Sequence, residues 1–127
     1  MTTAEQVLRA LEGRKYISIT TYRKSGKGVS TPVEFVIKDS AIYVRAREGS
    51  GKIRRVLANP NVTVAPCTLR GIVTGPSFEG TAVLIDDDGA LYPLFSHKYG
   101  LLWKLGTRIR KTTHQPMKIV PKTVESQ

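Results

Sequence analysis

Residues 16–47, YISITTYRKSGKGVSTPVEFVIKDSAIYVRAR, decide the fold, because β-forming segments alternate there with turn signals. Ile17 and Ile19 fall on one face of the first segment, and Ser18 and Thr20 fall on the other, as in a half-buried strand. Glycines and the Asp39-Ser40 pair supply the turns. We therefore expect an antiparallel meander of three strands, beginning at residue 16 and covering about 29–38 and 41–47.

The flanking sequence adds short strands and helices. We expect an amphipathic helix ending at Gly13, a helix at about 50–58, strands opening near Val62, at 77–85 and at 117–120, and a late helix over 91–102. Pro93 should kink or restart that helix, and Gly80 should mark a bulge or a close backbone approach. Barrel closure removes exposed strand edges, so we expect a mainly β, closed or nearly closed barrel in a single domain, residues 1–127.

The composition limits the chemistry and the partners. The 127 residues carry a formal net charge of +10, which suits nucleic acid, an anionic membrane or a phosphorylated coenzyme. One cysteine and two histidines provide neither an internal disulfide nor a zinc ligand set, so no metal site is expected. The sequence shows no apolar run of membrane-spanning length and no signal peptide, which predicts a cytoplasmic protein with no membrane partner.

A candidate anion site lies in RAREGSGKIRR at residues 45–55, where a strand passes through a glycine-rich turn into a helix. Lys52, Arg54 and Arg55 oppose the positive end of the helix dipole, and a bound phosphate would resolve that conflict. Ser50 and Gly51 would bring a hydroxyl and close backbone amides to the phosphate oxygens. The alternative is that these long side chains simply point into solvent.

Six motifs together resemble the pyridoxamine phosphate oxidase-like, FMN-binding split barrels, and within them the small deazaflavin-dependent oxidoreductases. They are YISITT at 16–21, STPVEF at 30–35, GSGK at 49–52, NPNVTVAPC at 59–67, EGTA at 79–82 and KYG at 98–100. The resemblance implies a six-stranded antiparallel split β-barrel with flanking helices. It also implies a homodimer with two coenzyme sites at the subunit interface.

The resemblance further implies which residues bind the coenzyme. Those along the ring would be Ser30, Thr31, Pro32 and Val33, flanked by Arg45 and Ala46, with Pro66 and Cys67 approaching from the next strand. Those at the phosphate would be Ser50, Gly51 and Lys52, assisted by Arg55. Thr31 and Pro32 also fit a plain strand entry, and Cys67 fits a small buried residue better than a nucleophile.

The implied activity is hydride transfer from reduced deazaflavin, coenzyme F-420, to a conjugated organic acceptor, with no protein nucleophile. Tyr99, His97, His114 or water would supply a proton, and the sequence does not choose among them. The basic residues Arg108, Arg110 and Lys111 would steer the acidic tail of that coenzyme.

Three alternatives remain open. FMN would bind in place of deazaflavin, or the protein would carry a coenzyme without catalysis. A more remote alternative is a single-stranded nucleic-acid-binding barrel with stacking residues at Tyr16, Tyr22, Phe35 and Tyr43, although core packing explains several of these rings more simply.

Overall fold

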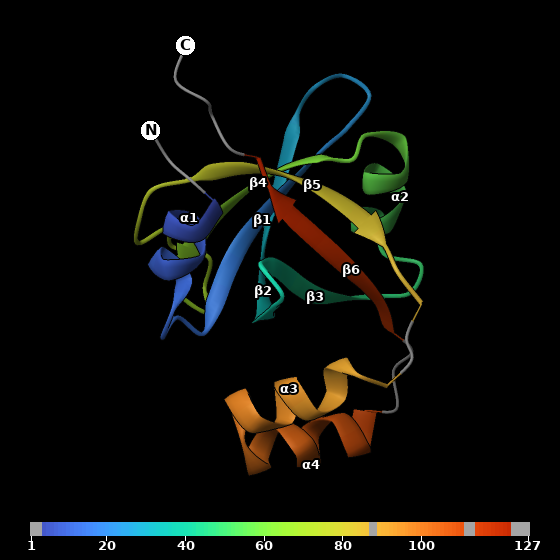
Figure 1. The fold of residues 1–127 in the computed structure, drawn as a ribbon. Helices are drawn as coiled ribbons and strands as arrows, with labels where there is room; N and C mark the ends of the chain where they lie inside the picture. The colour runs from blue at the N-terminus through green and yellow to red at the C-terminus, as the bar shows by residue number, and fades with distance from the viewer. Residues whose placement is uncertain (1–3, 87–88, 111–113, 123–127) are drawn as a thin grey trace.

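The computed structural model describes residues 4–86, 89–110 and 114–122, with residues 107–110 described by their backbone alone. These described residues form four helices and six strands in succession (Figure 1). Their order is α1 (Ala4–Leu11), β1 (Tyr16–Tyr22), β2 (Gly28–Lys38), β3 (Ala41–Arg47), α2 (Gly51–Ala58), β4 (Asn61–Cys67), β5 (Phe78–Leu84), α3 (Leu91–Tyr99), α4 (Leu101–Arg110) and β6 (His114–Pro121).

The strands form a closed antiparallel barrel in the order β1-β2-β3-β6-β5-β4, which confirms the predicted fold class. The meander at residues 16–47 supplies the first three strands, and the tight β2–β3 connection is the two-residue turn Asp39-Ser40. Asp39 and Ser40 have φ of 50° and 62°, and Lys38 pairs with Ala41. Two successive left-handed residues suit the right-handed twist of a hairpin.

Alternating residues fill the barrel, as the period-two pattern predicted. Ile17, Ile19 and Phe35 are fully buried, together with Met117 and Ile119 of β6. Helices α1 and α2 lie on opposite sides of the barrel in Figure 1, and each adds a buried residue to the same core, Leu11 and Val56 respectively.

The last strand is longer than predicted. The expected strand at 117–120 is β6, His114–Pro121, which pairs with β3 on one side and β5 on the other. The sequence prediction stopped short at both ends of this strand because Pro116 and Pro121 are there, and proline is disfavoured inside sheets. Pro116 still takes part through its carbonyl, which accepts a hydrogen bond from the Ile85 amide at 3.2 Å.

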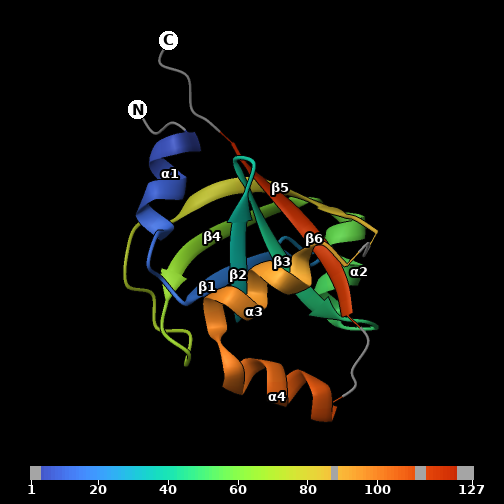
Figure 2. The same cartoon turned by 60° about the horizontal axis from the view of Figure 1, so that its bottom comes forward.

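The prediction that Pro93 kinks or restarts the late helix was wrong. Pro93 is the third residue of α3, where a missing N–H removes no helical hydrogen bond. The break falls instead at Gly100, whose φ of 85° ends α3 before α4 begins at Leu101. The two helices form a hairpin that lies below the barrel in Figure 1, and in Figure 2 α3 crosses in front of the strands while α4 lies below them.

The Tyr99 hydroxyl attaches α3 to the barrel where the β1–β2 ladder ends. It accepts a hydrogen bond from the Phe35 amide at 2.9 Å, and it lies 2.7 Å from the Lys15 carbonyl and 3.0 Å from the Phe35 carbonyl, to which it donates. Burial raises the pKa of Tyr99, so the hydroxyl keeps its proton and serves as a structural link.

Gly80 allows β5 and β6 to approach closely, as predicted. A Cβ atom on Gly80 would lie 2.9 Å from Ile119 Cγ2 and 3.1 Å from the Val120 carbonyl oxygen. The backbone oxygen cannot move without disturbing the Gly80–Pro121 end of the β5–β6 ladder.

We expect Gly80→Ala to lower the free energy of unfolding by about 1–3 kcal/mol, the usual cost of overpacking. Gly106→Ala is the matched control, because a Cβ at Gly106 in α4 meets nothing within 4 Å. That control should leave stability unchanged or raise it by about 0.5–1 kcal/mol. Urea unfolding measures both, and equal effects would refute the close approach.

We expect Tyr99→Phe to cost about 1–3 kcal/mol of stability, because the Phe35 amide and the Lys15 carbonyl lose a shared partner. Tyr92→Phe removes the same atom from the exposed side of α3 and serves as control. Thermal unfolding that shifts equally in both variants would contradict the anchoring role of Tyr99.

Candidate functional site

The barrel wall opens between β2 and β3. Their ladder begins at the Phe35–Val44 pair, so residues 28–34 of β2 pair with β1 alone, and residues 45–47 of β3 pair with β6 alone. Pro32 lies in the unpaired part of β2 and has no N–H to offer a neighbour, which suits such an edge. This opening exposes strand backbone that a ligand can contact.

A cleft of about 640 Å³ lies at the opening, between the barrel and the α3–α4 hairpin. Its lining residues come from strands, helices and the loop after β4: Tyr16, Pro32, Val33, Glu34, Arg45, Arg47, Leu69, Phe95, Leu102, Trp103, Gly106 and His114.

An aromatic wall faces Arg45 across this cleft. The rings of Phe95 and Trp103 are stacked with centroids 5.8 Å apart, and the Arg45 guanidinium carbon lies 5.9 Å and 5.8 Å from them. Trp103 Nε1 donates a hydrogen bond to Glu34 at 3.2 Å. These contacts fix α4 against β2 and β3, so the cleft has a defined shape.

The start of α2 gathers the candidate phosphate ligands. Ser50 occupies the N-cap in an extended conformation, and no side chain caps the helix. Its Oγ atom is buried and has no hydrogen-bond partner within the described residues. Gly51 follows, and a Cβ there would lie 2.6 Å from Arg55 Nη1, so glycine leaves room for the guanidinium.

Arg55 and Lys52 concentrate positive charge at this helix end. Arg55 Nε donates a hydrogen bond to Thr21 Oγ1 at 2.6 Å, which holds the guanidinium over the first turn. Burial lowers the pKa of Lys52, and Arg55 lowers it further by repulsion. The first turn contains no acidic residue. An anion bound here would relieve the repulsion and satisfy the Ser50 hydroxyl.

The structure thus brings the predicted site residues into two neighbouring groups. Ser50, Gly51, Lys52 and Arg55 form the helix-terminal group, and Pro32, Val33 and Arg45 line the cleft. Thr31 belongs to the same open part of β2, and its Oγ1 is buried without a partner among the residues described.

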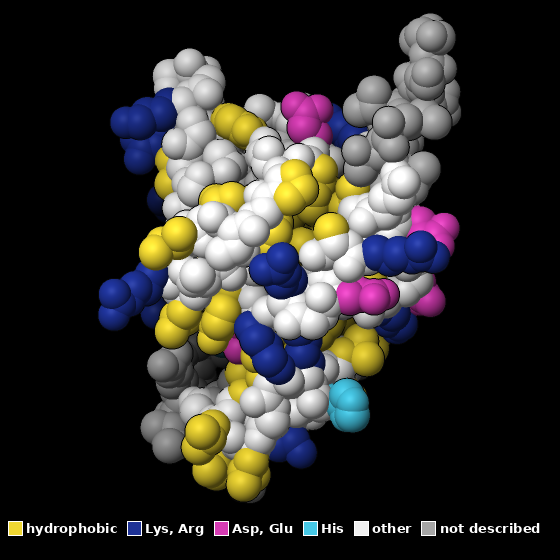
Figure 3. Space-filling model, turned by 90° about the vertical axis from the view of Figure 1, so that its left-hand side faces the viewer, with side chains coloured by type: hydrophobic (Ala, Val, Ile, Leu, Met, Phe, Trp, Pro, Cys, Tyr) yellow, Lys and Arg dark blue, Asp and Glu magenta, His cyan; other side chains and the backbone are white. Residues whose placement is uncertain are grey.

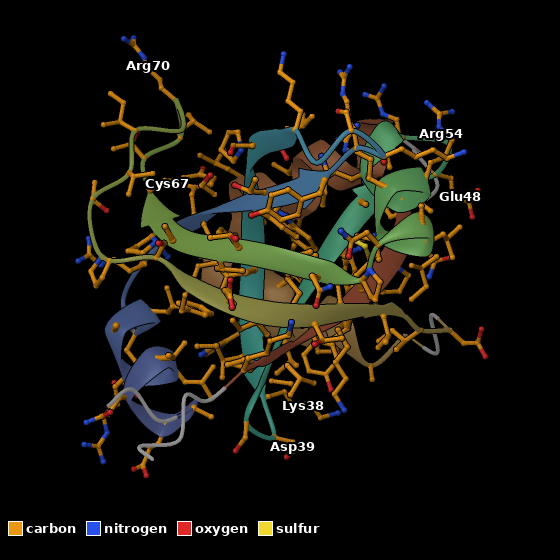
Figure 4. All side chains as sticks on the ribbon, turned by 90° about the horizontal axis from the view of Figure 1, so that it is seen from above. Lys38, Asp39, Glu48, Arg54, Cys67 and Arg70 are labelled. Atoms are coloured by element: carbon orange, nitrogen blue, oxygen red, sulfur yellow. The ribbon has the colours of Figure 1, made fainter. Side chains whose placement is uncertain are left out.

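The remaining predicted ring contacts do not line the cleft. Ser30 shares a hydrogen bond with Thr20 at 2.6 Å on an exposed face, and Ala46 is buried in the barrel core. Pro66 and Cys67 are buried at the end of β4, and burial raises the pKa of the Cys67 thiol. Figure 4 shows Cys67 below the loop that carries Arg70, well away from Arg54 and Glu48 near α2.

The structure distinguishes the three proton-donor candidates. His114 lines the cleft, Tyr99 binds backbone at the hairpin junction, and His97 is exposed. The side chains of Arg108, Arg110 and Lys111, predicted to steer an acidic tail, lie outside the described residues. The sequence did not predict the aromatic wall. Phe95 and Trp103 lie in helices far along the chain from β3, and only the tertiary fold brings them close to Arg45.

A family model described as pyridoxamine 5'-phosphate oxidase matches residues 3–126. The chain therefore belongs to the pyridoxamine 5'-phosphate oxidase family, whose FMN-binding split barrel is the fold seen here. No curated protein matches the sequence.

Solved structures share this fold at low sequence identity. An FAD-binding protein from Mesorhizobium loti superposes with a TM-score of 0.66 at 15% identity, covering 96% of this chain and 90% of its own. An F420 reductase gives 0.61 at 20% identity, covering 94% and 95%. The heme storage protein HutZ from Vibrio cholerae gives 0.65 at 15%, covering 98% and 93%. The names of these three proteins thus refer to different ligands, although the fold is shared.

Two features are absent from the described residues. No helix there is long and apolar enough to cross a membrane. No group of three or more histidine, cysteine, aspartate or glutamate side chains in those residues is arranged to hold a metal ion.

Lys98 lies beside the Tyr99 anchor, at the junction of the hairpin and the barrel. Its Nζ donates to the Phe35 carbonyl at 2.8 Å and lies 3.3 Å from the centroid of the Phe35 ring. Burial lowers the pKa of Lys98 to about 8, with repulsion from Lys15 adding to the shift and Glu34 opposing it.

We expect Lys98 to make stability rise with pH between about 8 and 10.5, because in this range the unfolded chain holds its proton and the folded chain releases it. The unfolding free energy of wild type minus that of Lys98→Met should therefore increase across this range. Urea unfolding at several pH values measures the difference, with Lys38→Met at an exposed position as control. A flat or falling difference for Lys98 would contradict its lowered pKa.

Proposed function

We propose that the chain is an oxidoreductase that binds the deazaflavin coenzyme F-420 and transfers hydride from its reduced form to a conjugated organic acceptor. The observation that carries the proposal is the start of α2, where Lys52, Arg55 and the unpartnered Ser50 hydroxyl converge on a glycine. This donor set fits a phosphate, which accepts several charge-assisted hydrogen bonds at once.

The rest of the coenzyme would extend towards the opening between β2 and β3. Residues 28–34 offer strand backbone and the Thr31 hydroxyl along one side, and Arg45 lies on the other. Bound there, a reduced deazaflavin supplies a hydride. The protein orients the ring and the acceptor, excludes water through the aromatic wall, and holds a titratable imidazole, His114, in the same cleft.

Coenzyme F-420 takes precedence over FMN for two reasons. The motifs quoted from the sequence resemble the deazaflavin-dependent group, and the net charge of +10 favours a coenzyme with an acidic tail. FMN is the second candidate, because the phosphate site suits both coenzymes and an FAD-binding protein shares the fold.

We also propose a homodimer as the functional unit. Large apolar side chains remain exposed in the described part of the single chain, among them Leu101 at 71% and Leu102 at 84%. Hydrophobic side chains gather at the lower end of the molecule in Figure 3, over the α3–α4 hairpin. A second copy would cover such a surface.

We expect Lys52→Ala to weaken coenzyme F-420 binding by about tenfold or more, because one charge-assisted hydrogen bond to the phosphate is lost. Arg54→Ala is the matched control, since Arg54 is exposed on the same helix (Figure 4). Fluorescence titration of the purified protein with oxidised F-420 and, separately, with FMN measures both.

Equal affinities of the two variants would contradict the phosphate site. Tighter binding of FMN would keep the site and change the coenzyme. If F-420 binds but its reduced form is never oxidised in the presence of conjugated acceptors, the protein is a carrier. If neither coenzyme binds, a random oligonucleotide is the next ligand to test, with salt dependence as the diagnostic.

A further inference from the structure

The cleft contains a cation, Arg45, that has no hydrogen-bond or ion-pair partner among the described residues. The Arg45 side chain is half-buried. Its guanidinium carbon lies 5.9 Å and 5.8 Å from the ring centroids of Phe95 and Trp103. Ring faces stabilise the charge but accept none of the N–H groups that a guanidinium presents.

The basic lining residues of the cleft lie on two neighbouring strands, β3 and β6. Arg45 and Arg47 lie on one face of β3, because the residue between them, Ala46, is buried in the core. His114 is paired with Arg47 in the neighbouring strand β6 and lines the same cleft. These three side chains form the basic end.

Most of the other lining residues are apolar. Pro32 and Val33 of β2, Leu69 of the loop after β4 and Leu102 of α4 are among them, and the Trp103 ring is held in place by its hydrogen bond to Glu34. Glu34 is the acidic side chain found in the described lining, and that bond directs it towards α4. A planar, largely apolar ligand suits these residues.

A neutral apolar ligand that filled the cleft would displace water from the Arg45 guanidinium without replacing the hydrogen bonds to that water. This desolvation costs binding free energy. A carboxylate would replace that water with two parallel charge-assisted hydrogen bonds, since its geometry matches the planar guanidinium. The cleft therefore favours an acid over its neutral analogue.

We infer that the cleft binds a planar conjugated organic acid, with its carboxylate on Arg45 and its apolar body between β2 and the Trp103 wall. This inference deepens the proposed function by naming the substrate class, and the binding it predicts does not require the coenzyme. The Arg45 site is separate from the phosphate site at Lys52, since Lys52 does not line the cleft.

The test compares naphthoate with naphthamide, which differ in charge but share the aromatic body. Both are titrated into the coenzyme-free protein by calorimetry, and fluorescence of Trp103, the only tryptophan in the sequence, reports whether they enter the cleft. We expect naphthoate to bind about tenfold more tightly than naphthamide, as one charge-assisted contact implies.

Arg45→Gln should abolish this preference, whereas Arg54→Gln, outside the cleft, should keep it. Arg45→Lys keeps the positive charge but lacks the planar guanidinium, so it should retain only part of the preference for naphthoate. This variant still tests the inference if Arg45→Gln does not fold. Lys52→Ala should keep the preference, although its affinity for coenzyme F-420 is expected to fall.

Several results would overturn the inference. They are equal binding of the two probes to the wild type, no binding of either at millimolar concentration, and an undiminished preference in Arg45→Gln. Loss of the preference in Lys52→Ala would place the carboxylate at α2 and would also overturn it. Because no coenzyme is present, a failure of the proposed function in the F-420 titration stays distinguishable from these results.

Discussion

The backbone of Phe35 is the point on which the site depends. Its ring is fully buried in the barrel, and its pair with Val44 is the one at which the β2–β3 ladder stops. Its amide and carbonyl bind the Tyr99 hydroxyl, and the carbonyl also accepts from Lys98. One residue therefore joins the core, the start of the opening and the anchor of the α3–α4 hairpin. The hairpin covers the opening because it is attached where the opening begins.

Electrostatics explain why the two polar groups of the site stay available for ligands. Lys52 and Arg55 repel each other over a helix terminus, and Arg45 lies over aromatic rings, so in both places the cations form no ion pair with a carboxylate of the described residues. Glu34, which also lines the cleft, accepts a hydrogen bond from Trp103 Nε1. Such arrangements cost stability in the ligand-free protein and are typical of binding sites.

Much of the barrel was predictable because strand alternation is a local signal. Residues 16–47 gave three strands and a two-residue turn, and the helix at Gly51–Ala58 was found from its glycine turn and its cations. β6 was predicted too short, because Pro116 and Pro121 are residues that disfavour a strand when only the local sequence is considered. In the structure β6 pairs with β3 and β5, and these pairings extend the strand to both prolines. The cleft was only partly predicted. Pro32, Val33 and Arg45 came from motifs, but Phe95 and Trp103 reach Arg45 through tertiary packing that no local pattern encodes.

A fold does not fix a ligand, so any specificity of this barrel rests on the side chains around its opening. The strand edge at residues 28–34 pairs with β1 alone and presents backbone rather than a discriminating set of side chains. The residues that discriminate come from elsewhere, namely Ser50 and Lys52 at α2 for an anion, and Arg45 under Trp103 for a second one. These two cationic positions belong to different elements, α2 and β3, so under the proposed function coenzyme and acceptor specificity would vary independently.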